Sequence, residues 1–280
     1  MTKGVNTLVV LGSGMSTGVP MIGCHCPVCT HSDSKNRRLR SSVFLKTAGG
    51  AHLLVDAGPD LRTQLLREGI ERVDGALITH EHADHCHGLD DLRPLSFKLQ
   101  EGLPIYAPSR IKDKIVQKFS YGFQRKKGVE GAKGRAPGGV PRFNLVEIGE
   151  GKGEIGEEAF EFFFNPHGPI ETLALIHHKM AYLVDCHEIK PKRVEELRQK
   201  NLDLLLLDCT GLRPHPAHLH LEKALHYAQK IAPKRCGLIH LGHDFEHNQL
   251  ENDLKREFSG SGGGPSIFPV YDGQELSYGI

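Results

Sequence analysis

Residues 79 to 88, THEHADHCHG, place four histidines and two acidic residues within ten positions. His80 and His82 are two positions apart, so in an extended chain their side chains point the same way and can share one metal ion. Asp84 and His85 follow in a turn and can face a second ion beside the first. A solvated or hydrogen-bonded side chain is the ordinary interpretation of a single histidine. Four ligand-type residues at this spacing instead predict a metal centre.

The zincin arrangement, in which two histidines four positions apart bind zinc on one helix face, is excluded. After His80 and Glu81 it would require a histidine at position 84, which is Asp84. Glu81 is interpreted as a solvated neighbour of the cluster, and His87 is expected to pack or cap locally rather than bind metal.

Three further ligand-type residues each end an apolar run. His167 follows FEFFFNP, Asp185 ends AYLVD, and His240 lies in CGLIHL. Each residue alone could be a strand-end side chain that meets solvent. Together with the cluster they make seven ligands, which is enough for two ions with an open, water-filled position.

The cysteines form a second constellation, Cys24-X-Cys26-X-X-Cys29, which we call the knuckle. This spacing is too tight for simple disulfide pairing and is one ligand short of a tetrahedral zinc site. A structural zinc is favoured over three unrelated buried thiols. Candidates for the fourth ligand include His25, His31 and Cys236. The other three cysteines lie beside metal motifs and are interpreted as small buried residues: Cys86, Cys186 and Cys209.

Short β-branched runs that end in turn residues must position these ligands. Strands are expected at 7–12, 42–47, 52–58, 75–80, 159–165, 181–186, 202–209 and 236–241, and helices at 61–69, 191–200 and 219–231. The pattern predicts a mixed α/β class with packed sheets. Residues 128–141 and 259–265 lack any period and are interpreted as loops. The GSGMSTG stretch at 12–18 is expected to form a tight turn beside the site and lacks the glycine pattern of a dinucleotide motif.

Composition limits the partners. The 280 residues are 39% hydrophobic and 25% charged, and 35 Lys and Arg against 34 Asp and Glu give a net charge of +1. No net field would therefore hold a long RNA or a membrane surface. The N-terminal MTKGVNTLVVLG does not match a signal peptide, and no stretch approaches the ~18 apolar residues of a membrane span. An odd set of seven cysteines suits metal binding in a reducing compartment, so we expect a cytoplasmic protein.

The cluster THEHADH with His167, Asp185 and His240 resembles the metallo-β-lactamase fold superfamily of metallo-hydrolases. The stretches LGSGMSTGVP, CHCPVC, NRRLRSSVFL, LLVDAGPDLR and HGLDDLR are similar to one branch, the phosphoribosyl cyclic phosphodiesterases of phosphonate metabolism. The tRNA 3′-processing endonucleases are more distant relatives. The resemblance implies a single αββα sandwich domain over residues 1–280, with a dinuclear metal site at one sheet edge and hydrolysis by a metal-bridging hydroxide.

The resemblance also implies roles for individual residues. His80, His82 and His167 would hold one ion, Asp84, His85 and His240 the other, and Asp185 would bridge them. Zinc, manganese or iron suits this ligand set. Asp56 would buttress the histidine loop, although from the sequence alone it could equally form a turn at the end of a strand. His243 would complete a structural zinc site with the knuckle. Asp84 and His218 are the expected catalytic residues. His218 would give a proton to the leaving group, with His215 and His220 as alternatives.

The leading function is therefore metal-dependent hydrolysis of a small phosphodiester, such as a cyclic ribose or nucleotide ester. An RNA-processing endonuclease would need a basic exosite, for which only the loop at 125–142 offers charge. A thioester or lactone hydrolase would use the same ligands, and a non-catalytic zinc-binding protein is the least favoured class. We expect a small phosphodiester as partner, with no membrane and no extended nucleic acid, and a homodimer is compatible with the sequence. Four arginines could recognise phosphate, although surface solvation is expected for most of them: Arg37, Arg38, Arg40 and Arg93.

Overall fold

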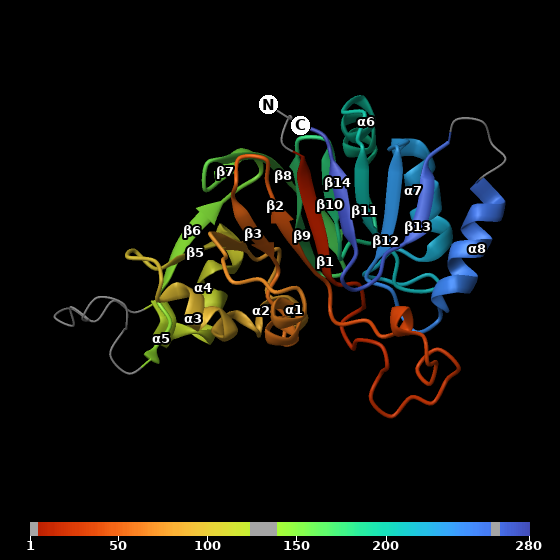
Figure 1. Ribbon diagram of the computed structural model, residues 1–280. Helices are drawn as coiled ribbons and strands as arrows, with labels where there is room; N and C mark the ends of the chain where they lie inside the picture. The colour runs from red at the N-terminus through yellow and green to blue at the C-terminus, as the bar shows by residue number, and fades with distance from the viewer. Residues whose placement is uncertain (1–4, 124–138, 259–263) are drawn as a thin grey trace.

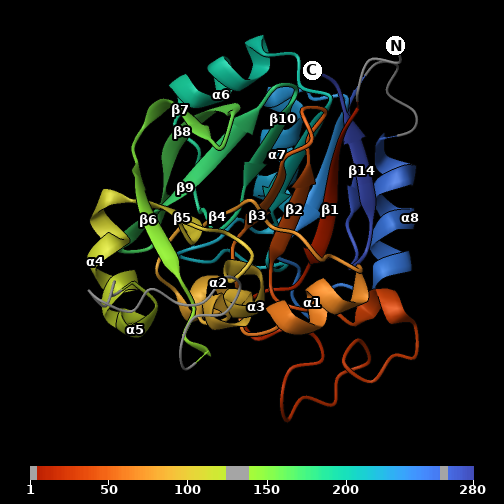
Figure 2. The same cartoon turned by 60° about the vertical axis from the view of Figure 1, so that its left-hand side comes forward.

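The computed structural model describes residues 5–123, 139–258 and 264–280. Two sheets of seven strands pack face to face, and helices cover the outer face of each sheet (Figures 1 and 2). The predicted αββα sandwich is confirmed. Most of the two aperiodic stretches, 128–141 and 259–265, lies outside the described residues, as does most of the basic loop at 125–142.

The first sheet is antiparallel on one side and parallel on the other. Strands β14, β1, β2 and β3 pair antiparallel, whereas β3, β4, β5 and β6 pair parallel. In sheet order the strands are β14 (Glu275–Tyr278), β1 (Asn6–Gly12), β2 (Ser42–Lys46), β3 (His52–Val55), β4 (Gly75–Leu77), β5 (Leu103–Pro108) and β6 (Phe143–Ile148).

The second sheet has the same mixture. Strands β13, β12, β11 and β10 pair parallel, and β10, β9, β8 and β7 pair antiparallel. In sheet order they are β13 (Ser266–Pro269), β12 (Arg235–Ile239), β11 (Leu204–Asp208), β10 (Met180–Leu183), β9 (Ile170–His177), β8 (Glu158–His167) and β7 (Gly151–Ile155).

The helices divide between the two outer faces. Those packed outside the first sheet or beside its edge are α1 (Leu61–Arg67), α2 (Ala83–Cys86), η2 (Leu89–Leu92), α3 (Arg93–Ser96), α4 (Ser109–Lys118) and α5 (Ser120–Phe123). Those packed outside the second sheet are α6 (Pro191–Gln199), α7 (Leu221–Ile231) and α8 (His247–Phe258). One short 3₁₀ turn, η1 (Ser34–Asn36), lies in the long loop between β1 and β2. Within the described parts of the chain, no helix has the length and apolar character needed to cross a membrane.

Three apolar clusters correspond to the three interfaces between these four layers. The central cluster joins residues of the first sheet, such as Leu8 and Val10, to residues of the second, such as Tyr182 and Leu206. Each buried side chain of this size contributes roughly 1.5–3 kcal/mol, so the interface between the sheets is a major source of stability. It also fixes the two sheet edges relative to each other.

Several expected strands are shorter than predicted at their carboxyl ends. The run expected at 52–58 ends at Val55, because Asp56 has a left-handed φ of +64°. The run expected at 75–80 ends at Leu77. Strand patterning does not reveal such departures, because the residues that leave the strand remain buried like those inside it. The predicted helices agree more closely, and α6 begins at Pro191 as expected.

Two glycines bring the loop after β3 against the histidine cluster. A Cβ atom at Gly58 would lie 2.1 Å from the Asp84 carbonyl oxygen, and one at Gly88 would lie 1.9 Å from the Gly58 carbonyl oxygen. The Gly88 amide also donates to the Ala57 carbonyl oxygen at 2.8 Å. Only glycine at both positions allows the two backbones to lie this close.

We therefore expect Gly88→Ala to destabilise the fold by about 1–3 kcal/mol, because backbone atoms must move apart to admit the methyl group. Urea unfolding measures this change. Gly149→Ala is the matched control, since nothing lies within 4 Å of a Cβ atom there. Equal unfolding midpoints for the two variants would contradict the role of this contact.

Candidate metal centres and active site

The predicted ligands converge at the edge of the two sheets where α1 and α2 lie (Figure 1). They come from the carboxyl ends of strands in both sheets. Three residues at this edge, Asp56, Asp185 and His240, have left-handed φ angles of +64°, +56° and +63°. This conformation is uncommon for residues with a side chain, and it turns the chain immediately after β3, near the end of β10 and after β12.

The first predicted ligand group is assembled as expected. His80, His82, His167 and Asp185 each offer a ligand atom, and these atoms all lie within 4.8 Å of one another. The Nε2 atom of His80 is 3.2 Å from Oδ2 of Asp185, and Nε2 of His167 is 3.3 Å from Nδ1 of His82.

The second group shares one member with the first. His85, Asp185 and His240 also offer atoms that lie within 4.8 Å of one another. Nε2 of His85 is 2.8 Å from Oδ2 of Asp185 and 3.2 Å from Oδ2 of Asp84. Nδ1 of His240 is 3.2 Å from Oδ1 of Asp185. Asp185 is therefore common to both groups, which is the position predicted for a bridging ligand.

The site contains buried polar atoms whose hydrogen-bonding capacity is unused. Among the described residues, Nε2 of His80, His85 and His240 and Oδ1 of Asp185 lack a hydrogen-bond partner. Leaving such atoms unpaired in the interior costs about 1–3 kcal/mol each. Divalent cations would satisfy them, and imidazole nitrogens with carboxylate oxygens suit zinc, manganese or iron. The residues present thus fit two metal ions.

Other side chains fix the orientation of the imidazole rings from behind. Asp56 Oδ2 lies 2.7 Å from Nδ1 of His85, and Asp56 Oδ1 accepts a hydrogen bond from the Thr79 amide at 2.8 Å. The Ser41 hydroxyl lies 3.0 Å from Nδ1 of His240. Such partners fix the tautomer and direction of a metal-binding histidine. Asp56 occupies the buttressing place that the family resemblance implies for it.

Burial holds most of these imidazoles in their neutral form. It lowers the pKa of His80, and the same cause lowers the pKa of His82 and of His240. A neutral imidazole has a free lone pair, which a metal ligand requires. His85 differs: burial opposes its protonation, but three carboxylates, foremost Asp185, raise its pKa well above the usual value. A metal ion at Asp185 would take the place of that proton.

His218 lies beside the metal ligands, and a residue missed in the sequence holds it there. Its Nδ1 atom is 3.0 Å from Oδ2 of Asp208 and 3.7 Å from Oδ1 of Asp185. Asp208 ends β11, is fully buried, and also accepts a hydrogen bond from the Cys186 amide at 3.1 Å. Burial opposes protonation of His218, but Asp208 raises the pKa of His218 above its usual value. The sequence does contain a sign of Asp208, since the pair Asp-Cys ends both AYLVDC and LLLLDC.

Neighbouring histidines and Glu81 have other surroundings. The ring of His215 lies 5.0 Å from that of His218, and its Nδ1 accepts from the Ala217 amide. His220 is the residue before α7, and His87 is exposed. The interpretation of Glu81 as a solvated residue is wrong: its side chain is only 14% exposed, and its carboxylate pairs with Lys114.

The knuckle and His243 form a second candidate metal site. Nδ1 of His243 is 3.3 Å from the sulfur of Cys24, 3.5 Å from that of Cys26 and 3.7 Å from that of Cys29. A hydrogen bond from the Cys29 amide lowers the pKa of the Cys26 thiol to about 6, which favours the thiolate form that binds zinc. Three thiolates and one imidazole make a complete tetrahedral ligand set.

The three competing fourth ligands lie elsewhere. His25 is exposed, His31 accepts from the Asp33 amide at 3.1 Å, and Cys236 is buried in the core beneath α7. The ligand atoms of Cys24, Cys26, Cys29 and His243 all lie within 4.8 Å of one another.

The expectation of surface solvation is wrong for Arg38. Its side chain is buried, and its guanidinium donates to the carbonyl oxygens of Gly242 and Phe245 at 2.7 Å each. These carbonyl groups lie on either side of His243 in the chain, so Arg38 fixes the loop that presents this residue. Arg40 pairs with Asp60 at 2.9 Å.

The other two arginines are less buried than Arg38, whereas most residues of the turn at 12–18 are buried. Arg93 pairs with Asp90 at 2.5 Å, and Arg37 is exposed. The expected tight turn at 12–18 includes Gly14, which bridges to Arg40 and to Leu241, directly after His240.

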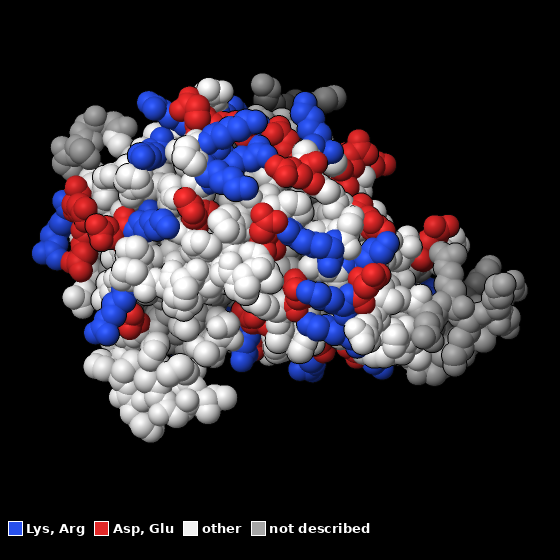
Figure 3. Space-filling view, turned by 180° about the vertical axis from the view of Figure 1, so that it is seen from behind, with Lys and Arg blue, Asp and Glu red and all other residues white. Residues whose placement is uncertain are grey.

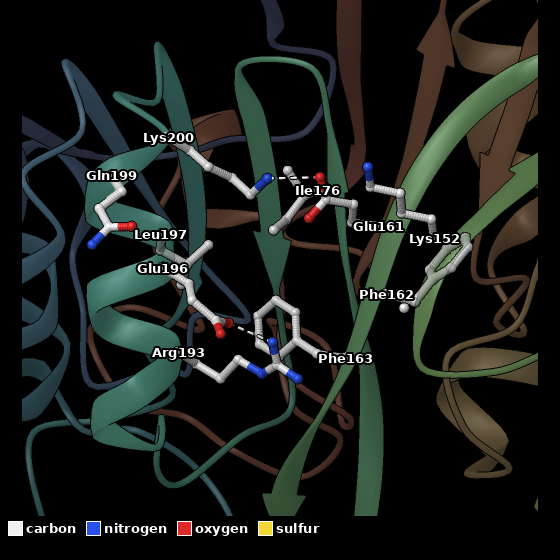
Figure 4. Close-up of a pocket in the computed structure, with 11 residues that line it drawn as sticks. Lys152, Glu161, Phe162, Phe163, Ile176, Arg193, Glu196, Leu197, Gln199 and Lys200 are labelled. Carbon is white, nitrogen blue, oxygen red and sulfur yellow. Dashed lines mark hydrogen bonds and ion pairs between the residues drawn. The ribbon is translucent and has the colours of Figure 1, made fainter.

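Two views show other parts of the surface. Figure 3 shows basic and acidic side chains interspersed on one face, with an uncharged lobe formed by the loop that carries the knuckle, residues 13–32 of which hold no charged side chain. Figure 4 shows a separate pocket of about 350 Å³ between α6 and β7 to β9. Two of its charged pairs are Lys200 with Glu161 and Arg193 with Glu196, and no proposed ligand lines it. The reaction is not expected there.

Comparison with known proteins decides the family. The family described as β-lactamase superfamily domain matches residues 52–241. A solved structure described as a new diphosphatase from the PhnP family is 35% identical, with a TM-score of 0.83 over 98% of this chain and 97% of that one. The chain belongs to the β-lactamase superfamily, and within it to the PhnP family. The resemblance to the metallo-hydrolases and to the phosphodiesterase branch is confirmed.

Two other relatives of this β-lactamase superfamily member are informative. A Porphyromonas gingivalis protein named octanoyltransferase is 34% identical over 274 residues, 95% of this chain but only 50% of that protein. The chain thus spans about half the length of this curated relative. The structure of human tRNase Z, short form, has a TM-score of 0.64 at 18% identity over 98% of this chain and 100% of that one, a likeness that shows the fold alone.

The knuckle generates a test of its own. We expect Cys26→Ser to lose one zinc ion per chain and to lower the melting temperature, because a thiolate-rich site that ties loop 13–32 to His243 adds metal-binding free energy to folding. Elemental analysis and calorimetry measure both effects. His25→Gln, which changes an exposed residue within the same knuckle, should keep the zinc. A Cys26→Ser protein with unchanged zinc content and melting temperature would exclude a structural site.

Proposed function

We propose that this β-lactamase superfamily member is a metal-dependent phosphodiesterase that acts on a small substrate, such as a cyclic ribose or nucleotide phosphodiester. The observation that carries the proposal is the shared position of Asp185 between two histidine groups. That arrangement suits two divalent ions, which would supply Lewis acidity toward the phosphoryl oxygens and would lower the pKa of a bound water. The two ligand groups would be those predicted from the sequence: His80, His82, His167 with Asp185, and Asp84, His85, His240 with Asp185.

Within this proposal the chain's own residues orient the substrate and move a proton. Asp84 is the proposed ligand of the second group that is only partly buried, and its carboxylate lies 3.2 Å from Nε2 of His85. His218 is proposed to protonate the leaving alkoxide. Asp208 favours its protonated form and, through the contact at Nδ1, leaves Nε2 free to donate.

Two further features support a phosphate substrate of small size. The structurally similar PhnP-family protein is described as a diphosphatase, and diphosphate hydrolysis shares attack at phosphorus with phosphodiester hydrolysis. The net charge of +1 favours a small substrate over an extended polyanion.

We propose a single catalytic domain that works in a reducing compartment, in keeping with seven unpaired cysteines.

Hydrolysis of a thioester or another acyl compound is the second candidate. The observation that favours it is the relative named octanoyltransferase, whose name describes transfer of an acyl group. The alignment covers half of that protein, so its named activity can belong to the other half. The same metal ligands would serve an acyl substrate.

A substrate panel separates these functions. Metal-replete protein is assayed with bis-p-nitrophenyl phosphate, a cyclic ribose phosphate, a dinucleotide joined by a diphosphate, precursor tRNA and an octanoyl thioester. Turnover of the small phosphate esters with no cleavage of precursor tRNA is expected. Turnover of the thioester alone would overturn the phosphodiesterase proposal.

His82→Ala and Asp185→Ala should each abolish turnover of the phosphodiester, because both metal ions are needed and each variant removes a proposed ligand. Far-UV circular dichroism should remain close to that of the parent, and metal content should fall. His87→Ala is the matched control, since His87 is an exposed neighbour outside both ligand groups. Substantial activity in either ligand variant would contradict the proposed dinuclear site.

His218→Ala should lower the rate on an alkyl or cyclic ribose diester by about 10²–10⁴-fold, the usual cost of losing a general acid. The loss should be much smaller with an aryl diester, because p-nitrophenolate leaves without a proton. Asp208→Asn should show the same dependence on leaving group in a weaker form. His220→Ala is the control. Equal losses of His218→Ala activity on both substrates would remove His218 from the proton-donor role.

A further inference from the structure

A further group of ligand-type residues lies at the opposite edge of the sheets, where the two chain ends are seen in Figure 1. Glu158 begins β8, His177 ends β9, and His178 follows in the two-residue turn that leads to β10. One ligand atom from each residue lies within 4.8 Å of the other two. Neither the sequence motifs nor the proposed reaction uses these residues.

The spacing within this group is close to the longer separations among the proposed active-site ligands. Nε2 of His177 lies 3.3 Å from Oε2 of Glu158. The corresponding separations at the active site are 3.2 Å for His80 with Asp185, 3.2 Å for His85 with Asp84 and 2.8 Å for His85 with Asp185. A separation of 3.3 Å is one at which both atoms can bind the same ion.

Two partners orient these ligands from behind, as Asp56 and Ser41 do at the active site. The Tyr278 hydroxyl lies 2.8 Å from Nδ1 of His177, so Nδ1–H can donate to it and leave the Nε2 lone pair facing Glu158. The Thr47 hydroxyl donates to Oε1 of Glu158 at 2.5 Å, which leaves Oε2 for the shared space. Metal-binding histidines and carboxylates are held in this way by outer partners.

The turn places the third ligand at some conformational cost. His178 has a φ of +52°, in the left-handed region that favours glycine. Its ring lies 4.4 Å from that of His177, at an interplanar angle of 70°. The His177 ring is fully buried and stacks on Phe160 at 4.6 Å, whereas His178 is exposed. A cation would therefore have two fixed ligands, Glu158 and His177, and one exposed ligand, His178.

We propose that Glu158, His177 and His178 form a third, separate divalent-cation site that binds Zn²⁺ or a similar borderline ion through two imidazoles and one carboxylate. Such an ion would tie the turn between β9 and β10 to the start of β8 and, through Thr47 and Tyr278, to β2 and β14 of the other sheet. Its role would be to stabilise the edge opposite the active site, independently of the proposed reaction.

His178→Gln tests the site, because an exposed side chain can be changed without disturbing the core. The full-length protein is freed of metal, equilibrated with Zn²⁺ buffered near 1 µM free ion, and analysed for zinc. We expect the parent to hold one ion more per chain than His178→Gln, and zinc to raise the melting temperature of the parent more than that of the variant. Loss of a direct ligand should weaken this site by more than the 10–100-fold that loss of an outer partner costs.

Two other variants make the result specific. Glu158→Gln keeps a hydrogen-bonding group beside Thr47 but removes the charge, and it should lose the same ion. His226→Gln removes an exposed histidine of α7 that belongs to none of the candidate groups, and it should match the parent. Equal zinc content in the parent and His178→Gln would overturn the proposal and leave Tyr278, His177 and Glu158 as a hydrogen-bonded chain. Phosphodiesterase turnover should be unchanged in His178→Gln, so this outcome does not depend on the proposed function.

Discussion

The buried carboxylate of Asp185 is the constraint on which the architecture of the active site depends. It is 2% exposed and has the imidazoles of His80, His85 and His240 within 3.2 Å. An isolated buried charge costs several kcal/mol, and the surrounding histidines cannot all hold protons because like charges would then repel. Two cations at this position would satisfy the carboxylate and the neutral imidazoles together. The αββα layers bring this buried carboxylate and these histidines together at one edge of the sheets.

The chain departs from regular strand geometry at three residues of the site. Asp56, Asp185 and His240 all have positive φ, and each such residue costs of order 1–3 kcal/mol of strain. That cost can be sustained because the strands before them are anchored in the apolar interfaces between and outside the sheets. Close approach of Gly58 and Gly88 then fixes the turn that carries Asp84 and His85. The ligands are thus positioned by buried strands, while the turns carry the strain.

The sequence predicts the parts of this site that repeat a local pattern. Two histidines two positions apart after an apolar run, an acid and a histidine in the turn that follows, and single polar residues that end later runs together identify the seven candidate ligands. It does not predict Asp208, although Asp-Cys ends two neighbouring strands, because its contact with His218 depends on how β11 and the segment before α7 meet. The buried role of Arg38 is also hidden, since its acceptors lie 204 and 207 positions away in the chain. In the sequence, the turn at His178 looks like any polar hairpin turn. Only the fold places Glu158 beside it.

A short chain segment between His240 and His243 connects the knuckle to the active site. His243 lies three residues after His240, and the intervening backbone is held at both ends: the Leu241 amide donates to Ser13 at 2.8 Å and the Gly242 amide to Thr210 at 2.9 Å. The guanidinium of Arg38 donates hydrogen bonds to the carbonyl oxygens of Gly242 and Phe245, on either side of His243. The loop after β1 therefore contacts this short segment both through the knuckle and through its own backbone. A structural ion at the knuckle would limit the positions open to His240 without touching the substrate, which gives a physical reason for a thiolate site so close to an open hydrolytic one.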